Sequence, residues 1–327
     1  MKPFDYQRPH GLGEAHQLLV ADGAKPIAGG TNLLDLMKLE VETPTALVDV
    51  NRLPLGGIAP HDAGLHIGAL VSNSACAADP RIRGQYPVLA RAILAGATFQ
   101  LRNKATTGGN LCQRTRCYYF TDLSQACNKR EPGSGCAAIG GFNRIHAILG
   151  ASDACIATYP GDMAVALSAL EATVEIVDAK DNKRTVPVRD FHRLPGDTPE
   201  RDNVLEPGDV ITGVVLPAPA GGTQLYRKVR DRASYAFALV SVAAVIHVEG
   251  GVIARARLAF GGLAHKPWHD PRVETLLEGE APSDALFDQA AALLLDEARG
   301  QGSNDFKIPL TRRTLKAVLR EATGGTL

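Results

Sequence analysis

Four cysteines spread along one loop-like segment are the residues of this chain best suited to chemistry. Cys117, Cys127, Cys136 and Cys155 are separated by nine, eight and eighteen residues, and the stretch at 128–135 reads Asn-Lys-Arg-Glu-Pro-Gly-Ser-Gly. A segment this long without an apolar period is uncommon inside a compact domain and is usually functional. Four thiols could tie it down by binding an iron–sulfur cluster or zinc, or by forming disulfides.

Local charge and cysteine spacing favour an iron–sulfur cluster among these alternatives. Thiolate-bound clusters are anionic, so neighbouring cations stabilise them. Residues 111–146 carry an excess of three positive charges, from Arg114, Arg116, Lys129, Arg130 and Arg144 against Asp122 and Glu131. Structural zinc sites usually take their ligands in close pairs, and only Cys112 and Cys117 form such a pair. Free structural cysteines, a disulfide and zinc remain the alternatives from the residues alone, and Cys76 lies well outside the segment.

Composition excludes several classes of protein. Lys plus Arg equals Asp plus Glu at 35 each in 327 residues, so no net field attracts nucleic acid or an anionic membrane. The chain has no apolar stretch of about eighteen residues, and we expect no membrane span. The N-terminus lacks the apolar region of a signal peptide. We therefore expect synthesis in the cytoplasm, where thiols stay reduced, and export only with a signal-bearing partner.

Two glycine-rich loops have the composition of anion-binding loops. One is Ile-Ala-Gly-Gly-Thr-Asn-Leu at 27–33, and the other is Thr-Thr-Gly-Gly-Asn at 106–110, directly before the cysteine segment. Paired glycines let backbone N–H groups approach an anion, and the threonine and asparagine side chains add donors. Neither loop is the dinucleotide fingerprint or a Walker loop, and a tight turn is the alternative for each. Two such loops beside a redox-type cysteine segment predict a cofactor that contains a pyrophosphate.

Hydrophobic patterning predicts an α+β chain of two domains. Strands are expected at 25–28, 45–50, 65–70, 172–178, 185–188, 209–216, 224–229, 237–247 and 252–260, and helices at 31–40, 88–95, 162–170, 285–297 and 310–321. Asp162 is expected to be the N-cap of its helix. Pro-Ala-Pro-Ala-Gly-Gly at 217–222 is the clearest linker. We therefore predict a larger domain at 1–217, with the inserted loop at about 112–155, and a smaller domain at 222–327.

These motifs together resemble the flavin subunits of the molybdenum hydroxylase (xanthine dehydrogenase) family. The stretches at 28–34 and 106–111 resemble the two FAD motifs of that family. The cysteine segment is similar to that of one branch, the flavin subunits of bacterial periplasmic aldehyde oxidoreductases, which carry an inserted 4Fe–4S cluster. The run Tyr-Arg-Lys-Val-Arg-Asp-Arg-Ala-Ser-Tyr-Ala-Phe-Ala at 226–238 continues the similarity. The chain departs from the family at Cys112, where relatives carry an apolar residue, and at Tyr159 and Gly161.

The resemblance implies a fold, two cofactors and two partners. The implied fold is an FAD-binding domain of the vanillyl-alcohol-oxidase-like (PCMH) type with two subdomains, followed by a C-terminal α+β domain with a three-stranded sheet and helices. The implied FAD-binding residues are Lys25, Pro26, Ile27, Ala28, Gly29, Gly30, Thr31, Asn32, Leu33, Thr107, Gly109, Asn110, Asp162 and Lys228. The implied ligands of one 4Fe–4S cluster are Cys117, Cys127, Cys136 and Cys155. The implied partners are a small 2Fe–2S subunit and a large molybdenum-cofactor subunit, in a heterotrimer of the periplasm.

The implied function is electron transfer within an aldehyde oxidoreductase. The large subunit would oxidise the aldehyde to a carboxylic acid, and this chain would receive the electrons at FAD and pass them to an external acceptor. We expect no catalytic acid–base pair here, and we expect the nine scattered histidines to be surface or satisfied core residues. The alternatives are a subunit of another molybdenum hydroxylase (xanthine dehydrogenase or hydroxybenzoyl-CoA reductase type), a non-catalytic iron–sulfur scaffold, and a stand-alone flavin oxidoreductase.

Overall fold

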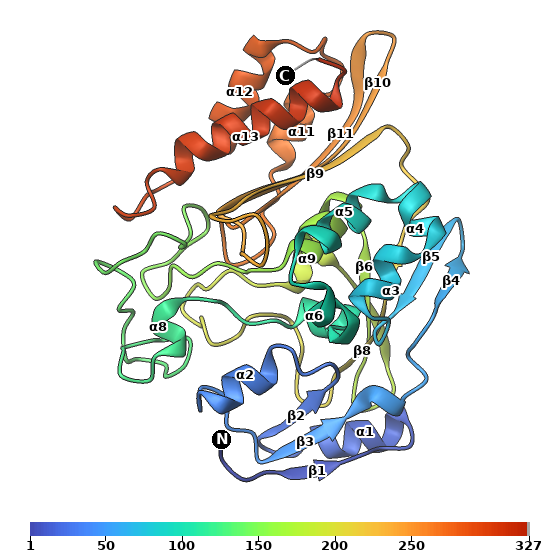
Figure 1. The fold of residues 1–327 in the computed structure, drawn as a ribbon, viewed down its shortest axis with the longest axis vertical. Helices are drawn as coiled ribbons and strands as arrows, with labels where there is room; N and C mark the ends of the chain where they lie inside the picture. Colours follow the sequence, from blue (N-terminus) through green and yellow to red (C-terminus); the bar gives the residue numbers. More distant parts are fainter. Residues whose placement is uncertain (326–327) are drawn as a thin grey trace.

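The computed structural model describes residues 1–325, in which three β-sheets are joined and covered by helices (Figure 1). The strands are β1 Asp5–Gln7, β2 Ala24–Ile27, β3 Ala46–Asp49, β4 Ile58–His61, β5 Gly64–Gly68, β6 Thr173–Val177, β7 Lys183–Pro187, β8 Val210–Leu216, β9 Thr223–Val229, β10 Val240–Glu249 and β11 Val252–Gly261. The helices are α1 Leu12–Leu19, α2 Leu33–Lys38, α3 Asn73–Ala78, α4 Pro80–Gln85, α5 Pro87–Ala95, α6 Phe99–Lys104, α7 Thr107–Leu111, α8 Tyr118–Thr121, α9 Asp162–Ala169, α10 Val188–Phe191, α11 Pro271–Leu277, α12 Asp284–Leu294 and α13 Lys307–Ala322.

The first two sheets contribute to one continuous hydrophobic core. The small parallel sheet has the order β1-β3-β2, and the larger antiparallel sheet has the order β4-β5-β8-β6-β7. Strand β8 lies between β5 and β6, so the chain returns into this sheet after the long excursion at 112–155. Buried side chains of α5, α9 and the central strands β5, β6 and β8 fill this core.

The third sheet is antiparallel, with the order β9-β10-β11, and has helices on both faces. Helix α13 packs on β10, α11 packs on β11, and α9 contacts β10 and β11. Because both faces of the middle strand are covered, its first seven residues, Val240–Ile246, are all buried. This explains why β10 reads as a nearly continuous apolar run instead of alternating.

Helix α9 packs on β10 and β11 of the third sheet and on α5, and all eight of its residues are buried. A helix that is apolar nearly all round belongs in a core. Its first residue, Asp162, is an exception, and the structure corrects its expected role. Gly161 is the N-cap, with no side-chain cap hydrogen bond, and the carboxylate of Asp162 instead accepts from Lys228 and Tyr226.

The expected α+β class and the C-terminal three-stranded sheet with helices are confirmed. Every strand and helix predicted from patterning is present, and the bounds are shifted by a few residues. The predictions missed short elements, above all β1, β4 and the small helices α1, α3, α4, α6 and α11. None of the helices within residues 1–325 is long and apolar enough to cross a bilayer.

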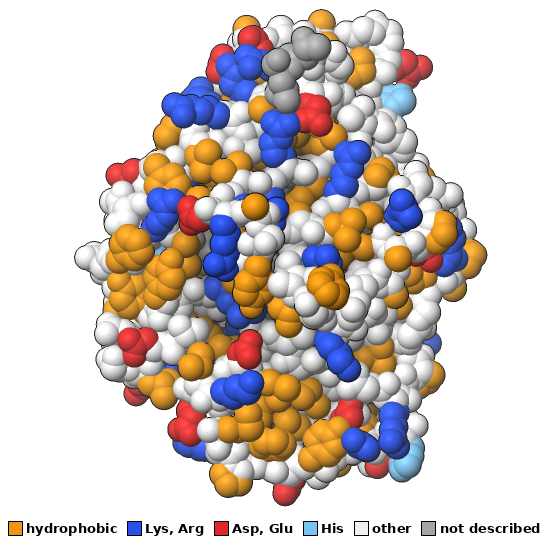
Figure 2. Space-filling model, in the orientation of Figure 1, with side chains coloured by type: hydrophobic (Ala, Val, Ile, Leu, Met, Phe, Trp, Pro, Cys, Tyr) orange, Lys and Arg blue, Asp and Glu red, His pale blue; other side chains and the backbone are white. Residues whose placement is uncertain are grey.

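The segment at 112–155 has little regular structure and a small core of its own. It contains the single helical turn α8 and isolated bridges such as the one between Cys127 and Cys136. Figure 2 shows apolar side chains gathered over this part of the surface, where Tyr118 stacks on Phe142 and both are exposed. Beneath them, Phe120 and Ile156 pack around the cysteines.

Candidate cofactor pocket and cysteine cavity

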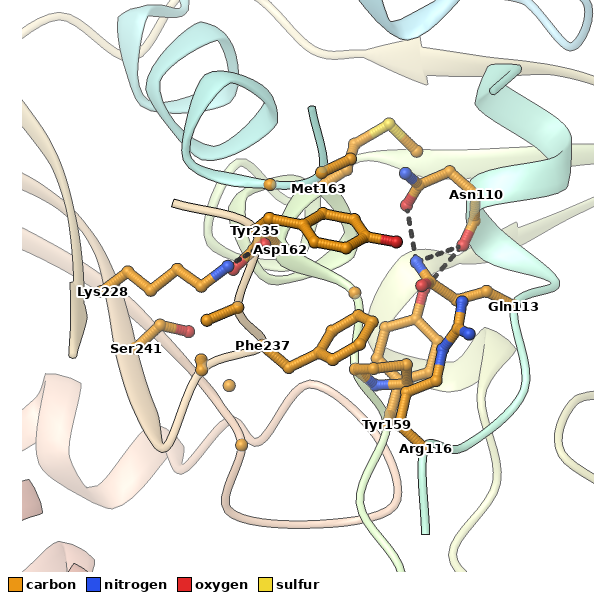
Figure 3. Close-up of a pocket in the computed structure, with 18 of the residues that line it drawn as sticks. Asn110, Gln113, Arg116, Tyr159, Asp162, Met163, Lys228, Tyr235, Phe237 and Ser241 are labelled. Atoms are coloured by element: carbon orange, nitrogen blue, oxygen red, sulfur yellow. Dashed lines mark hydrogen bonds and ion pairs between the residues drawn. The ribbon is translucent and has the colours of Figure 1, made fainter. Parts of the chain in front are cut away.

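A cavity of about 560 Å³ lies where the glycine loops, the start of α9 and the end of β9 meet (Figure 3). Its walls come from α2, α5, α6 and α7, from the segments 113–118 and 158–163, and from the loop 231–239. Six of the predicted FAD-binding residues line this cavity: Thr31, Asn32, Gly109, Asn110, Asp162 and Lys228. Residues as far apart in sequence as Thr31 and Lys228 are thus brought to one site, as the resemblance implied.

The other predicted FAD-binding residues do not line the cavity: Lys25, Pro26, Ile27, Ala28, Gly29, Gly30, Leu33 and Thr107. They belong to β2, to the loop after it, to the start of α2 and to the buried side of α7. Thr107 is buried, and its hydroxyl donates to the carbonyl oxygen of Val71 at 3.0 Å. Its proton is therefore committed to the backbone, in contrast to the donor role expected for this loop.

Close backbone packing joins the two glycine loops. A Cβ at Gly29 would lie 1.9 Å from the carbonyl oxygen of Lys104, so only glycine fits there. Gly30 adopts a φ of +70°, in the left-handed region that glycine enters freely. In the second loop, Thr106 caps α7 by accepting from the backbone N–H of Gly109 at 3.2 Å. These contacts hold both loops at one side of the cavity.

A buried ion pair forms the opposite wall. Lys228 Nζ lies 2.7 Å from Asp162 Oδ2 (Figure 3). The hydroxyl of Tyr226 donates to Asp162 Oδ1 at 2.6 Å. Burial raises the pKa of Asp162, and Lys228 and the tyrosine hydroxyl oppose that rise. Lys228 in β9 and Arg230, one residue beyond the end of that strand, both donate to the carbonyl oxygen of Ala95. The pair fixes the end of β9 against α5 and α9.

Three side chains in the cavity wall carry buried donor groups without a partner among the described residues. They are Asn32 Nδ2, Arg116 Nε and Ser241 Oγ. Asn32 is oriented by its Oδ1, which accepts from the backbone N–H of Arg114 at 2.9 Å. Arg116 lies with its guanidinium 5.0 Å from the centre of the Phe237 ring. Because a buried donor without an acceptor is costly, these groups fit a ligand rich in acceptor atoms.

Sequence reasoning missed Arg116, Gln113 and the aromatic side chains of this cavity. Figure 3 shows the rings of Tyr235 and Phe237 extending across it, opposite Asn110 and Tyr159. The hydroxyl of Tyr159 donates to the carbonyl oxygen of Asn110 at 3.0 Å. Flat aromatic walls beside hydrogen-bond donors suit a large planar ligand. The sequence signal for these residues was that Gln113 and Arg116, and likewise Tyr235 and Phe237, stand in runs that resembled the family.

The four predicted cluster ligands line a second, small cavity. Cys117, Cys127, Cys136 and Cys155 all face it, and no disulfide forms among the six cysteines. Burial raises the pKa of the Cys117 thiol to about 11, so a thiolate there needs a compensating positive charge. Within residues 1–325, no three His, Cys, Asp or Glu side chains are arranged around a single metal ion. Cys112 does not line this cavity and is exposed at the end of α7.

One short segment separates the two cavities. Along residues 115–119, Thr115, Cys117 and Tyr119 line the cysteine cavity, whereas Arg116 and Tyr118 line the larger one. Residues 115–117 precede α8, which begins at Tyr118, so the alternation runs from this non-helical segment into the first turn of the helix. The larger cavity and the four thiols therefore share a wall that is one backbone thick at this point.

The cation excess that the sequence indicated around the cysteines is partly neutralised by carboxylates from other segments. Arg114 is paired with both Glu42 and Asp202, and Lys129 Nζ lies 2.6 Å from Asp202 Oδ1. Burial would raise the pKa values of Glu42 and Asp202, but their cation partners outweigh it and hold both pKa values below the usual range. Arg130 instead donates to the backbone carbonyl oxygens of Tyr119, Phe120 and Gln125.

Comparisons with known proteins agree with this geometry. Residues 2–219 match the family described as the FAD binding domain in molybdopterin dehydrogenase, and residues 224–322 match the CO dehydrogenase flavoprotein C-terminal domain. The aldehyde oxidoreductase FAD-binding subunit PaoB of Escherichia coli (strain K12) is 54% identical over 98% of this chain and 99% of its own length. The glyceraldehyde dehydrogenase medium chain of Sulfolobus acidocaldarius is 28% identical over 88% of this chain and 86% of its own length. The quinoline 2-oxidoreductase structure from Pseudomonas putida 86 aligns over 99% of both chains at 26% identity, with a TM-score of 0.76.

Proposed function

This chain belongs to the family of FAD-binding subunits of molybdopterin dehydrogenases, and we propose that it is the FAD- and 4Fe–4S-containing electron-transfer subunit of an aldehyde oxidoreductase. In the proposed complex, a large subunit with a molybdenum cofactor oxidises an aldehyde to a carboxylic acid. FAD and the cluster supply the redox chemistry, and this chain binds, orients and electrostatically tunes them on the way to an external acceptor. The likeness to PaoB supports aldehydes as the substrate class.

The cavity between the glycine loops and α9 is the observation that carries the flavin part of this proposal. Its donors without partners, Asn32 Nδ2, Arg116 Nε and Ser241 Oγ, fit the many acceptor atoms of FAD. We propose that the loops at 25–33 and 107–110 hold the pyrophosphate part through backbone N–H groups. Asp162 and Lys228 would then bound the site from the opposite side, and the ring of Tyr235 or Phe237 would lie against the planar part.

The convergence of four thiols on one cavity supports the proposed cluster. Cys117, Cys127, Cys136 and Cys155 come from widely spaced positions and all line it. A cuboidal cluster binds each cysteine through a different iron, so its ligands lie farther apart than the ligands of one zinc ion. The compensating charge that the buried Cys117 thiolate requires would come from that iron.

We propose the same division of the chain and the same assembly that the sequence indicated. The FAD-binding domain would occupy 1–217, with the iron–sulfur insertion at about 112–155, and the C-terminal domain would occupy 222–327. The partners would be a small 2Fe–2S subunit and a large molybdenum-cofactor subunit, forming a heterotrimer. We further propose export to the periplasm with a signal-bearing partner, which cell fractionation and blotting for this chain would test.

Purification of the native complex tests the proposal directly. We expect three different subunits, and we expect aldehyde to bleach the flavin absorbance of the complex but not that of this chain alone. Recovery of this chain only as a monomer or homo-oligomer would contradict the assembly. Bleaching of the isolated chain by aldehyde would instead indicate a stand-alone flavin oxidoreductase.

A further inference from the structure

Two buried histidines contact two of the four thiols that face the cysteine cavity. His146 Nε2 lies 3.0 Å from Cys117 Sγ, and His265 Nε2 lies 3.3 Å from Cys155 Sγ. His146 is 1% exposed and His265 is 8% exposed, so water does not compete for either contact. His146 lies between Cys136 and Cys155 in the cysteine segment, and His265 lies in the loop that follows β11.

Burial fixes which ring nitrogen carries the proton. Nδ1 of each ring is buried and has no hydrogen-bond partner among the described residues. A proton there would leave a buried N–H unsatisfied and would turn the Nε2 lone pair toward sulfur lone pairs, which is repulsive. With the proton on Nε2, each ring donates an N–H toward the sulfur that it contacts.

The backbone around His146 is held by the N-terminal end of α13. The buried ammonium of Lys307 donates to the carbonyl oxygen of His146 at 2.8 Å and also to that of Gly262. Asn304 Nδ2 donates to the carbonyl oxygens of His146 and Ala147 at 3.2 and 3.0 Å. The C-terminal part of the chain thus orients a ring that faces the cysteine segment.

His265 is fixed in a similar way by backbone contacts on both sides. The carbonyl oxygen of Ala264 accepts from the backbone N–H of Tyr159 at 3.0 Å, and that of Leu263 accepts from Ile148 at 2.9 Å. Phe260 and Trp268 close the loop through a pair of hydrogen bonds of 2.8 Å. Both donors are therefore held in place before anything binds to the thiols.

We propose that His146 and His265 are positioning residues that donate Nε2–H hydrogen bonds to the cluster thiolates of Cys117 and Cys155. This inference rests on the proposed iron–sulfur cluster. A hydrogen bond to a ligand sulfur draws charge off the cluster and stabilises its more negative, reduced state. The two imidazoles would therefore raise the reduction potential of the cluster relative to one whose thiolates face only apolar groups.

Redox titration of the cluster in the purified complex, followed by EPR, tests this. We expect His146→Phe and His265→Phe to lower the midpoint potential while iron content is retained. His146→Gln keeps an N–H donor and should restore most of the shift. His16→Phe is the matched control, because His16 is buried and hydrogen-bonded to Gly208, far along the chain from any cysteine contact.

A measurement on the unaltered protein complements the variants. With ¹⁵N-histidine, pulsed EPR of the reduced cluster should detect coupling to imidazole nitrogen and to an exchangeable proton. If both Phe variants keep the wild-type iron content and the wild-type midpoint potential, the inference about the histidines is overturned, whereas the proposed cluster is not. Absence of the coupling would also overturn it. Absence of iron in the wild-type complex would overturn both the cluster and this inference.

Discussion

Replacement of Gly29 by alanine should weaken FAD binding by moving a loop, without placing any atom in the cavity. The new Cβ would lie 1.9 Å from the carbonyl oxygen of Lys104, whereas real Cβ atoms keep at least 3.0 Å. The two segments must therefore separate by about 1.1 Å. Forcing a methyl group into a packed site costs about 1–3 kcal/mol. Because both loops border the cavity and must close on the cofactor, this strain should raise the Kd for FAD about 5- to 150-fold.

The assay is equilibrium binding of FAD to the flavin-free chain, followed by the flavin fluorescence. Gly56→Ala is the matched control, since a Cβ there meets nothing within 4 Å, and its Kd should be unchanged. We expect the flavin-free Gly29→Ala chain to melt within a few degrees of the wild type, because the loops can separate when no cofactor is bound. A Kd within twofold of the wild-type value would refute the argument that close approach at Gly29 sets the binding geometry.

Three further predictions concern the buried charges and the thiols. Lys228→Met should destabilise the chain by about 3–5 kcal/mol in denaturant unfolding, since it leaves the Asp162 carboxylate buried without its cation; the double variant with Asp162→Asn should recover part of that loss, and full additivity would contradict the pairing. Asp202→Asn should lower the free energy of unfolding at pH 7. The difference from the wild type should vanish as the pH falls below about 4, through the depressed pKa of this carboxyl. A loss of stability that does not depend on pH would contradict the ion pairing of Asp202. Cys136→Ser should lose cluster iron whereas Cys112→Ser should keep it, and the reverse pattern would show that the ligand set is wrong.

The sequence predicted the site best where a residue type has few other uses. The four cysteines and the glycine loops were found from spacing and composition, and the structure brings each set together. Asp162 lines the larger cavity, but it is not the N-cap that the local pattern predicted. Its partners, Lys228 and Tyr226, lie more than sixty residues away, and no local pattern reveals them.

Other parts of the site could not be predicted because their meaning depends on tertiary contacts. His146 and His265 have no metal-ligand spacing in sequence, and only the fold places them against cysteine sulfurs. The local cation excess looked larger than it is, since Glu42 and Asp202 come from distant segments to pair with Arg114. Short elements such as α3 and α6 span fewer than two turns, which is too short for an apolar period to appear.

Iron, flavin and free-thiol analysis of this chain, separated anaerobically from its partners, tests the central claim most directly. Among the six cysteines, the four cluster ligands should resist alkylation in the folded, loaded chain and should become reactive once the iron is removed. We expect about four irons and about one FAD per chain. Six reactive thiols with no iron would contradict the cluster, and absence of FAD would contradict the account of the larger cavity.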